Sequence, residues 1–236
     1  MIDVAASSDE RVRVCLARHP DVGEVKIGDH PGVHFQIGNW SRNVWVGKPD
    51  LEVAGLVELM DNNPMVCADE TAVPDAVSTL ALIALGPIAW AGMILEPPSV
   101  ISSIDGDEDL LEEFLKSAGW HGGADLHYEE RNLGGVCAAM AMASIPTPAD
   151  WSEIDDLYDE RYGRSFFVRL DQESEWEPSL VAGKPHAVYR LSYTPGDLAS
   201  LLSIQVLADR HGKCGAAQVV HAMNVMAGFE ESLGAA

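Results

Sequence analysis

The sequence predicts an α/β protein in two parts: a small parallel sheet of doubly wound type, and then an α+β domain with a largely antiparallel sheet. Over residues 1–73, short apolar runs typical of strands alternate with helical patterns. Over residues 74–213, strand-like runs outnumber the helices that could connect parallel strands. A chain of 236 residues is long enough to bury a substantial core.

In the first part, strands and helices follow one another from the start. An apolar run over residues 2–5 suits a strand, and Ser7 or Ser8 can cap the helix after it. An apolar stripe from Leu51 to Met60 predicts a second helix that begins at Pro49. Further strands are expected at residues 22–27, 33–37, 44–46 and 65–67.

The second part begins with an uncharged run over residues 76–95 that is long enough to cross a bilayer. Gly86-Pro87 interrupts it, however, and its flanks, Asp75 and Glu96, give no Lys/Arg bias. We therefore expect a buried helix over about 75–85, followed by a second short element, and no membrane span. Further helices are expected at 107–118, 150–162 and 215–232, and further strands at 136–145, 166–170, 187–193 and 201–208.

The charge excludes several classes of partner. The chain carries 15 Lys and Arg against 37 Asp and Glu, a formal net charge of −22. So negative a protein repels nucleic-acid backbones and anionic membrane surfaces. The sequence therefore predicts neither nucleic-acid nor membrane binding, and its few positive side chains are candidates for holding a small acidic ligand.

The four cysteines, at positions 15, 67, 137 and 214, are far apart and form no CxxC motif. Disulfide frameworks are typical of short, cysteine-dense secreted chains. The first residues show no basic-then-apolar signal segment. We therefore expect reduced, mostly buried thiols in a cytoplasmic protein.

The most specific pattern lies at the end of the chain. Residues 213–234, KCGAAQVVHAMNVMAGFEESLG, resemble the closing helix of N-acetyl-gamma-glutamyl-phosphate reductases and related semialdehyde dehydrogenases. VAASSDERVRVCLARHPDV (4–22) is similar to the cofactor segment of this family, with its glycines lost. Three other segments are similar to family motifs: LIALGPIAWAGMI (82–94), LHYEERNLGGV (126–136) and YGRSFFVRL (162–170). The chain thus resembles a shortened and divergent member.

The resemblance implies a reduced Rossmann-like domain over residues 1–73, completed by the terminal helix at 214–232. It implies an α+β dimerisation domain of semialdehyde dehydrogenase type over residues 74–213, and a homodimer formed through the sheet of that domain. In the family, a cysteine is acylated by an acyl phosphate, a hydride from NADPH releases the semialdehyde, and a histidine assists.

Three parts of that chemistry are missing from the sequence. A Rossmann turn needs glycines to bring backbone amides to a pyrophosphate, but residues 5–10, AASSDE, contain none and carry two carboxylates. A gapless match places Ala76 on the nucleophilic cysteine, and alanine cannot attack an acyl phosphate. The catalytic histidine segment is absent after Gly106. We therefore expect a dimeric binding or regulatory protein without reductase activity and without a cofactor.

One alternative is an active oxidoreductase that acts on an aldehyde or an acyl phosphate. It would need a relocated thiol, Cys67 or Cys137, although Cys67 better suits a buried structural role. His127 would then be a further catalytic candidate. NADP would have to bind at the degenerate loop that contains Ala5, Ser7 and Ser8.

A second alternative is metal-assisted chemistry through His30 and His34. These residues stand four apart in a segment with proline and glycine, and no further acidic or cysteine ligand has suitable spacing. No metal is therefore expected.

A ligand pocket is expected where the family-like segments meet. Its predicted lining is His127, Arg131, Asn132, Lys213 and Gln218. Lys213 and Arg131 are rare positive charges in a very acidic chain, so they could hold an acidic ligand.

Overall fold

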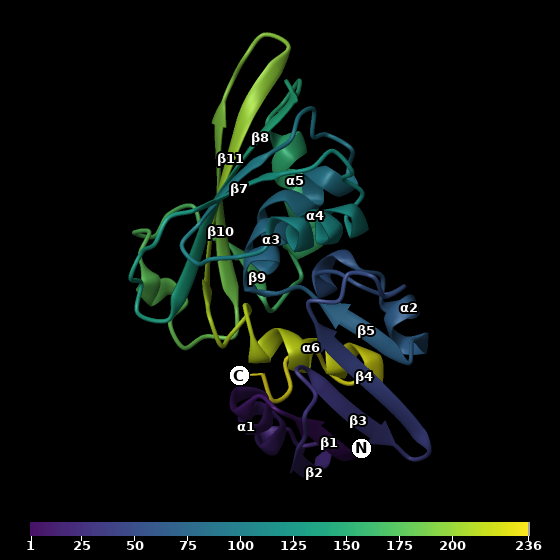
Figure 1. The fold of residues 1–236 in the computed structure, drawn as a ribbon. Coiled ribbons are helices and arrows are strands. Elements are labelled where there is room, and N and C mark those ends of the chain that lie inside the picture. Colours follow the sequence, from purple (N-terminus) through teal and green to yellow (C-terminus); the bar gives the residue numbers. More distant parts are fainter. Residues whose placement is uncertain (236) are drawn as a thin grey trace.

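The computed structural model describes residues 1–235 and builds them around two sheets (Figure 1). Sheet A contains β1 (Ile2–Ser7), β2 (Val22–Ile27), β3 (Val33–Ile37), β4 (Trp40–Val46) and β5 (Glu70–Val73). Sheet B contains β6 (Ser99–Ser102), β7 (Asp125–Tyr128), β8 (Val136–Pro146), β9 (Val168–Leu170), β10 (Ala187–Thr194) and β11 (Ala199–Asp209). The helices are α1 (Glu10–Arg18), α2 (Asn62–Cys67), α3 (Ala76–Trp90), α4 (Glu108–Ser117), α5 (Ser152–Tyr162) and α6 (Ala216–Ala227), with short 3₁₀ turns η1 (Val57–Leu59) and η2 (Pro178–Leu180).

Sheet A has the strand order β2-β1-β3-β4-β5 and is only partly parallel. β1 pairs with β2 and β4 pairs with β5 in parallel, whereas β3 runs antiparallel to both of its neighbours. The expectation of a parallel sheet is thus corrected at β3. The physical reason is the two-residue connection between β3 and β4, where Gly38 has a φ of +57°, because so short a loop can join only antiparallel strands.

The terminal helix α6 fills the core beneath sheet A. Val220 and Met223 of α6 are buried in one apolar cluster with Phe35 and Val44 of the sheet and Leu16 of α1. Figure 1 shows α6, in yellow, lying beside strands from the beginning of the chain. The helix was expected to reach residue 232, but a left-handed glycine, Gly228 with a φ of +72°, ends it sooner.

The opposite face of sheet A carries polar side chains. The Nδ1 atom of His34 lies 2.9 Å from Oδ1 of Asn43, and the Asn43 amide donates to Glu70 at 3.2 Å. Glu70 also accepts a hydrogen bond from the indole of Trp45 at 2.9 Å. A hydrogen-bonded polar network thus stands where a doubly wound sheet would carry its second layer of helices.

Sheet B has the order β7-β6-β8-β11-β10-β9, with an antiparallel centre and one parallel pair at each edge. This agrees with the largely antiparallel sheet expected from the sequence. Helices α3, α4 and α5 lie on one side of it (Figure 1). Their apolar side chains form one core with alternate residues of β8, β10 and β11.

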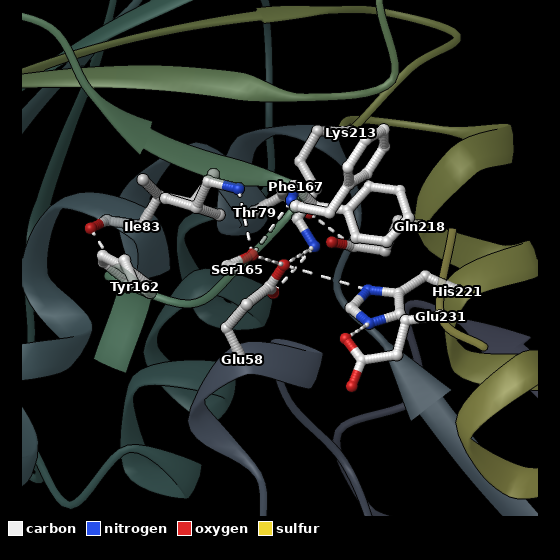
Figure 2. Close-up of polar contacts among 12 residues, drawn as sticks. Glu58, Thr79, Ile83, Tyr162, Ser165, Phe167, Lys213, Gln218, His221 and Glu231 are labelled. Atoms are coloured by element: carbon white, nitrogen blue, oxygen red, sulfur yellow. Dashed lines mark hydrogen bonds and ion pairs between the residues drawn. The ribbon is translucent and has the colours of Figure 1, made fainter. Parts of the chain in front are cut away.

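Helix α3 is continuous through Pro87, so the expected break at Gly86-Pro87 is wrong. Proline leaves the carbonyl four residues earlier, that of Ile83, without its helical donor. The hydroxyl of Tyr162 in α5 donates to that carbonyl at 3.2 Å (Figure 2). Helix α3 and η1 approach closely at Gly86, because a Cβ there would lie 2.2 Å from the side chain of Leu59. Among residues 1–235, no helix is long and apolar enough to span a membrane.

Residues 49–60 do not form the expected helix. Gly55 has a φ of +151°, and the backbone on either side of it pairs with β5: Gly55 N donates to Ala72 O at 3.0 Å, and Ala72 N donates to Val53 O at 2.9 Å. Residues 65–67, expected as a strand, end helix α2, and the strand β5 begins at Glu70. The apolar residues of this stretch therefore belong largely to an extended segment that pairs with β5, and not to a helix.

Arg42 of β4 is buried and joins the ends of two helices. Its guanidinium donates to the carbonyls of Met65 (2.8 Å), Val66 (2.9 Å) and Ala68 (2.6 Å) at the end of α2, and to that of Met226 near the end of α6. Carbonyls at helix ends lack intrahelical donors and attract positive charge. Arg42 therefore holds α2 and α6 against sheet A.

Replacement of Arg42 by methionine should lower the free energy of unfolding by about 3 kcal/mol or more, because several buried carbonyls lose their donor. Urea unfolding followed by circular dichroism measures the change. Arg131→Met is the matched control, since the Arg131 guanidinium contacts an exposed carboxylate, and it should leave the midpoint nearly unchanged. Equal effects from both variants would contradict the role assigned to Arg42.

Candidate functional site

A cleft lies at the carboxyl edge of sheet A, where β1, β4 and β5 end at Ser7, Val46 and Val73. Its volume is about 410 Å³, within the range of small-ligand sites. Open α/β sheets bind ligands at this edge. Asp9 and Val12 at the start of α1, the loop residue Pro31, and the strand ends Val46 and Val73 line one side of it. The rest of the lining comes from the start of α3 and from the turn before α6 with the first turns of α6: Pro74, Ala76, Arg210, His211, Cys214, Gly215, Ala216, Gln218 and Val219.

The start of α1 at this cleft is occupied by a side chain of its own. The Asp9 carboxylate accepts hydrogen bonds from the amides of Arg11 at 2.7 Å and Val12 at 3.4 Å. The Arg13 guanidinium donates to the carbonyls of Ser7 and Ser8 and so ties the loop to the first turn of α1. The amides that hold a pyrophosphate in a Rossmann turn are therefore already bound to a carboxylate here.

The predicted cofactor-loop residues lie near the same edge. Ala5 and Ser7 are buried within β1, and Ser7 Oγ accepts from the amide of Asp9 at 3.1 Å. Ser8 is exposed, and its hydroxyl donates to the carbonyl of His30 at 2.9 Å. The hydroxyl groups of both serines are thus hydrogen-bonded to the protein backbone.

The start of α3, like that of α1, is capped by a carboxylate of its own. The Asp75 carboxylate accepts from the amides of Val77 at 3.3 Å and Ser78 at 3.2 Å. Ala76, the first residue of α3, lines the cleft and offers no nucleophile. The carbonyl oxygen of Ala76 lies 3.7 Å from the sulfur of Cys214, which reaches it from the opposite wall.

The cysteines differ in burial and in their distance from the cleft. Cys67 is exposed at the end of α2, so the expectation that it is buried is wrong. Cys137 is buried at the start of β8 and does not line the cleft. Cys214, which lines the cleft, was missed as a site residue. The sequence held one signal for it, because Cys214 lies next to Lys213 in the terminal segment that carries the resemblance.

Lys213 is buried at the junction of the two sheets, where it pairs with Glu58 (Figure 2). The Lys213 ammonium lies 2.7 Å from each carboxylate oxygen of Glu58, and the exposed fractions of the two side chains are 0% and 4%. Ser165 also donates to Glu58, at 3.3 Å. The pair joins η1, the segment before β9, and the turn before α6.

His221 of α6 extends this cluster toward solvent. Its Nε2 atom lies 3.1 Å from Glu231, its Nδ1 atom lies 3.8 Å from Glu58, and its ring stacks on Phe167 with centroids 4.2 Å apart. Figure 2 shows the imidazole between the two carboxylates. The hydrogen bond from His221 outweighs partial burial and lowers the pKa of Glu231.

The charge state of Glu58 follows from its surroundings. Burial raises the pKa of a carboxyl, but the positive charge and hydrogen bonds of Lys213, together with the nearby His221, outweigh burial and lower the pKa of Glu58. Glu58 is therefore a carboxylate at neutral pH, and its charge is matched by Lys213. A fully matched internal pair is not available for binding a ligand.

The five residues of the predicted pocket lie in two places. Gln218 lines the cleft, and its amide donates to Thr79 Oγ1 at 2.8 Å, while Lys213 is committed to Glu58 close by. Arg131, by contrast, pairs with Glu129 and lines a separate cavity of about 350 Å³ on sheet B. His127 lies on β7, and Asn132 follows in the loop with Arg131, where its side chain accepts from the amide of Gly134.

The two histidines considered for a metal make other contacts. His34 bonds to Asn43 and Ser41, and the ring of His30 packs on Trp45 with centroids 3.9 Å apart. Within the part of the chain that the structure describes, no group of three or more His, Cys, Asp or Glu residues is arranged to hold a metal ion.

Positive side chains gather along the cleft and an adjoining cavity of about 290 Å³. The two cavities share His211 and Ala216. Four of the 15 Lys and Arg side chains line the two cavities, whereas only two carboxylates, those of Asp9 and Asp209, are in the lining. Asp209 is engaged by three backbone amides, those of Gly183, His211 and Gly212. We call the following set the cationic wall: Arg11, Arg18, Lys184 and Arg210.

Comparison with known proteins was informative only at the level of structure. No protein-family model matches the sequence, and no curated protein matches it. The fold is similar to that of aspartate semialdehyde dehydrogenase II from Vibrio cholerae, with a TM-score of 0.68 at 11% identity over 96% of this chain and 98% of that chain. The same enzyme complexed with ASA gives a TM-score of 0.68 at 12% identity with the same coverage. The fold class expected from the sequence is confirmed.

The buried pair yields a prediction of stability. Lys213→Met should lower the free energy of unfolding by about 3–5 kcal/mol, because Glu58 would stay buried without its partner. The double variant Glu58→Gln/Lys213→Met should recover much of that loss, because it removes both charges. Urea unfolding at pH 7 measures both, and Lys116→Met, which breaks an exposed pair with Glu113, is the control.

The same variants test the sign of the pH dependence. The folded-state pKa of Glu58 lies below its ordinary value of 4.5, so the unfolded chain binds the proton first as the pH falls. The contribution of Glu58 to stability is therefore present above pH 4.5 and is lost as the pH drops through the folded-state value. The double variant should lose less stability on acidification, and identical acid profiles would contradict the assignment.

Proposed function

Because the chain has the fold of a semialdehyde dehydrogenase, we propose that it is a dimeric binding protein for a small anionic ligand, without the reductase chemistry of that fold. One observation carries the proposal. Both helices that begin at the cleft, α1 and α3, have their first amides bound by their own carboxylates, Asp9 and Asp75, and α3 opens with Ala76. The cleft therefore offers neither a pyrophosphate cradle nor a nucleophile on α3.

The cationic wall supports an anionic ligand. In a chain of net charge −22, four positive side chains along the cleft and its adjoining cavity concentrate attraction for anions where most of the surface repels them. Arginine is well suited to carboxylate and phosphate groups because its planar guanidinium donates two parallel hydrogen bonds. The cleft volume of about 410 Å³ suits a ligand of amino-acid size with one or two acidic groups.

An active oxidoreductase with a relocated cysteine receives less support. Cys67 lies at the end of α2, Cys137 is buried in β8, and neither thiol lines the cleft. NADP would have to displace the carboxylate of Asp9 from the amides of Arg11 and Val12. Negative charge at that position opposes a pyrophosphate.

The absence of reductase chemistry is tested by NADPH oxidation with acyl-phosphate substrates, or by the reverse reaction with semialdehydes and arsenate. We expect no turnover above the enzyme-free rate, because the start of α3 lacks a nucleophile and the loop at α1 cannot cradle a pyrophosphate. An active reductase of this fold serves as the positive control. Turnover that disappears in Cys214→Ser would overturn the proposal and identify the thiol responsible.

Ligand binding is tested by thermal shift with aspartate, glutamate, N-acetylglutamate and inorganic phosphate. At least one of these anions should raise the melting temperature, and the shift should weaken with added salt. Arg210→Ala should weaken the binding about tenfold or more, since a charge-assisted hydrogen bond is lost. Arg131→Ala, on the separate cavity of sheet B, is the control and should bind as the wild type does. The proposal fails if no anion shifts the melt, or if both variants behave alike.

The second sheet supports the dimer. The side chains that alternate with its core residues face away from α3, α4 and α5. They include the half-buried Ile101, Met140 and Met142, with the small or neutral Ser203 and Gln205 beside them. A sheet face of apolar and small side chains can pack on a second copy of itself.

Light scattering coupled to gel filtration should give a dimer at micromolar concentration. Met142→Lys, which places a charge at the centre of this face, should shift the protein to the monomer. Ile27→Lys is the matched control, because Ile27 is 82% exposed at the edge of sheet A, and it should stay dimeric. A monomeric wild type would exclude the proposed dimer.

A further inference from the structure

A second, smaller cavity lies where α5 meets η1 and α6, at the junction of the two halves of the molecule. Its volume is about 170 Å³. A molecule of liquid water takes up about 30 Å³, so this space holds a group the size of a phosphate but not a nucleotide. In the part of the chain that the structure describes, it shares no lining residue with the cleft. We call it the seam cavity, and its titratable lining is Glu58, Arg161, Arg164, His221 and Glu231.

His221 brings to this cavity a buried nitrogen that has no partner. The side chain is 1% exposed, and its Nε2 atom lies 3.1 Å from the Glu231 carboxylate. Because a carboxylate only accepts, Nε2 carries a proton and Nδ1 is left over. Within residues 1–235, Nδ1 is buried and makes no hydrogen bond, since Glu58 lies too far away, at 3.8 Å (Figure 2). An unpaired buried polar atom is costly, so a group that fills the cavity and pairs with Nδ1 is favoured.

Two arginines at the end of α5 line the same cavity without a carboxylate partner. Arg161 lies in the last turn of α5 and is half-buried, and Arg164 follows the helix and is exposed. Among residues 1–235, the ion pairs made by arginine are those of Arg131 and Arg190. The Arg161 guanidinium stacks on the ring of Trp90, 3.6 Å from its centroid, and stacking leaves the N–H groups in the guanidinium plane able to donate.

The balance of charge at the seam cavity favours an anion. Both carboxylates of the lining are matched: Glu58 by the ammonium of Lys213 at 2.7 Å, and Glu231 by the hydrogen bond from His221. The two guanidinium groups are then left as unmatched positive charge. Arginine donates two parallel hydrogen bonds to a phosphate, and a phosphate group has enough oxygens to accept from several donors at once.

We propose that the seam cavity is a binding site for a phosphate group, to which Arg161, Arg164 and His221 donate. An unprotonated phosphate oxygen accepts from Nδ1 only when His221 carries both of its protons, so binding favours the imidazolium. The imidazolium is then hydrogen-bonded through both nitrogens and lies between the carboxylates of Glu58 and Glu231. The bound group connects α5, which packs against sheet B, with α6, which packs in the core of sheet A.

Isothermal titration calorimetry with inorganic phosphate, at an ionic strength held constant with sodium chloride, tests the site. It is made on the wild type and on Arg210→Ala, which removes a cation of the cleft and leaves the seam cavity unchanged. We expect phosphate to bind in both, and Arg164→Ala to weaken that binding about tenfold or more, because a charge-assisted hydrogen bond is lost. Arg169→Ala, an exposed arginine of β9 outside the cavity, is the matched control and should bind as the wild type does.

A second probe identifies the source of the phosphate group. Glycerol 3-phosphate is titrated beside inorganic phosphate, and the tighter of the two shows whether a phosphorylated metabolite or the free ion is the natural occupant. Acetate is the negative control, because its two oxygens cannot accept from three separate donors.

The histidine spectrum gives a readout that a purely structural role would not move. In long-range ¹H–¹⁵N spectra at neutral pH, the ring nitrogens of one histidine should shift toward imidazolium values as phosphate saturates the protein. That histidine should be missing from the spectrum of His221→Gln, which should also bind phosphate more weakly. If His221→Gln proves unstable, the exposed Arg164 decides through its own variant.

Three results would overturn the proposal: no binding of phosphate, equal binding by Arg164→Ala and Arg169→Ala, or acetate binding as tightly as phosphate. The cleft is decided separately. Loss of acidic amino-acid binding in Arg210→Ala concerns the cleft alone, whereas loss of phosphate binding in Arg164→Ala concerns the seam cavity alone.

Discussion

The fold depends on the burial of one ion pair, between Glu58 of η1 and Lys213 at the entrance to α6. Neither charge has access to water, so each is tolerable only while the other is in place. That condition fixes the connection between β4 and β5 against the turn after β11, which are far apart in the chain. The pair thereby positions α6, and α6 supplies the buried side chains without which sheet A has no core.

The position of α6 in turn builds the cleft. The turn that delivers Lys213 to Glu58 also carries Arg210, His211 and Cys214 to the carboxyl edge of sheet A. A binding site at this edge is typical of α/β folds, because parallel strands end there together. In this chain, carboxylates cap the starts of the two helices, while Arg210 and the thiol of Cys214 come from the opposite wall.

Sheet A carries polar contacts on the face that has no helices. His34, Asn43 and Glu70 form a hydrogen-bonded row across three strands, with Trp45 joined to Glu70. Polar side chains on a sheet face can remain in water, whereas an apolar face would need a covering layer. Sheet A therefore needs helices on one face only, and α6, from the end of the chain, covers much of that face.

The sequence by itself determined the features that local pattern controls. The strands at 22–27 and 33–37 were predicted with their observed limits, and the loss of glycines before α1 was visible directly. Only the tertiary structure decided which distant residues meet. Pro87 does not break α3 because Tyr162 supplies a donor, Lys213 is bound to Glu58 instead of a ligand, and Cys214 lies beside Ala76 at the cleft. A local pattern records the period of a segment, but the partner of a buried polar group or thiol is set by packing between segments far apart in the chain.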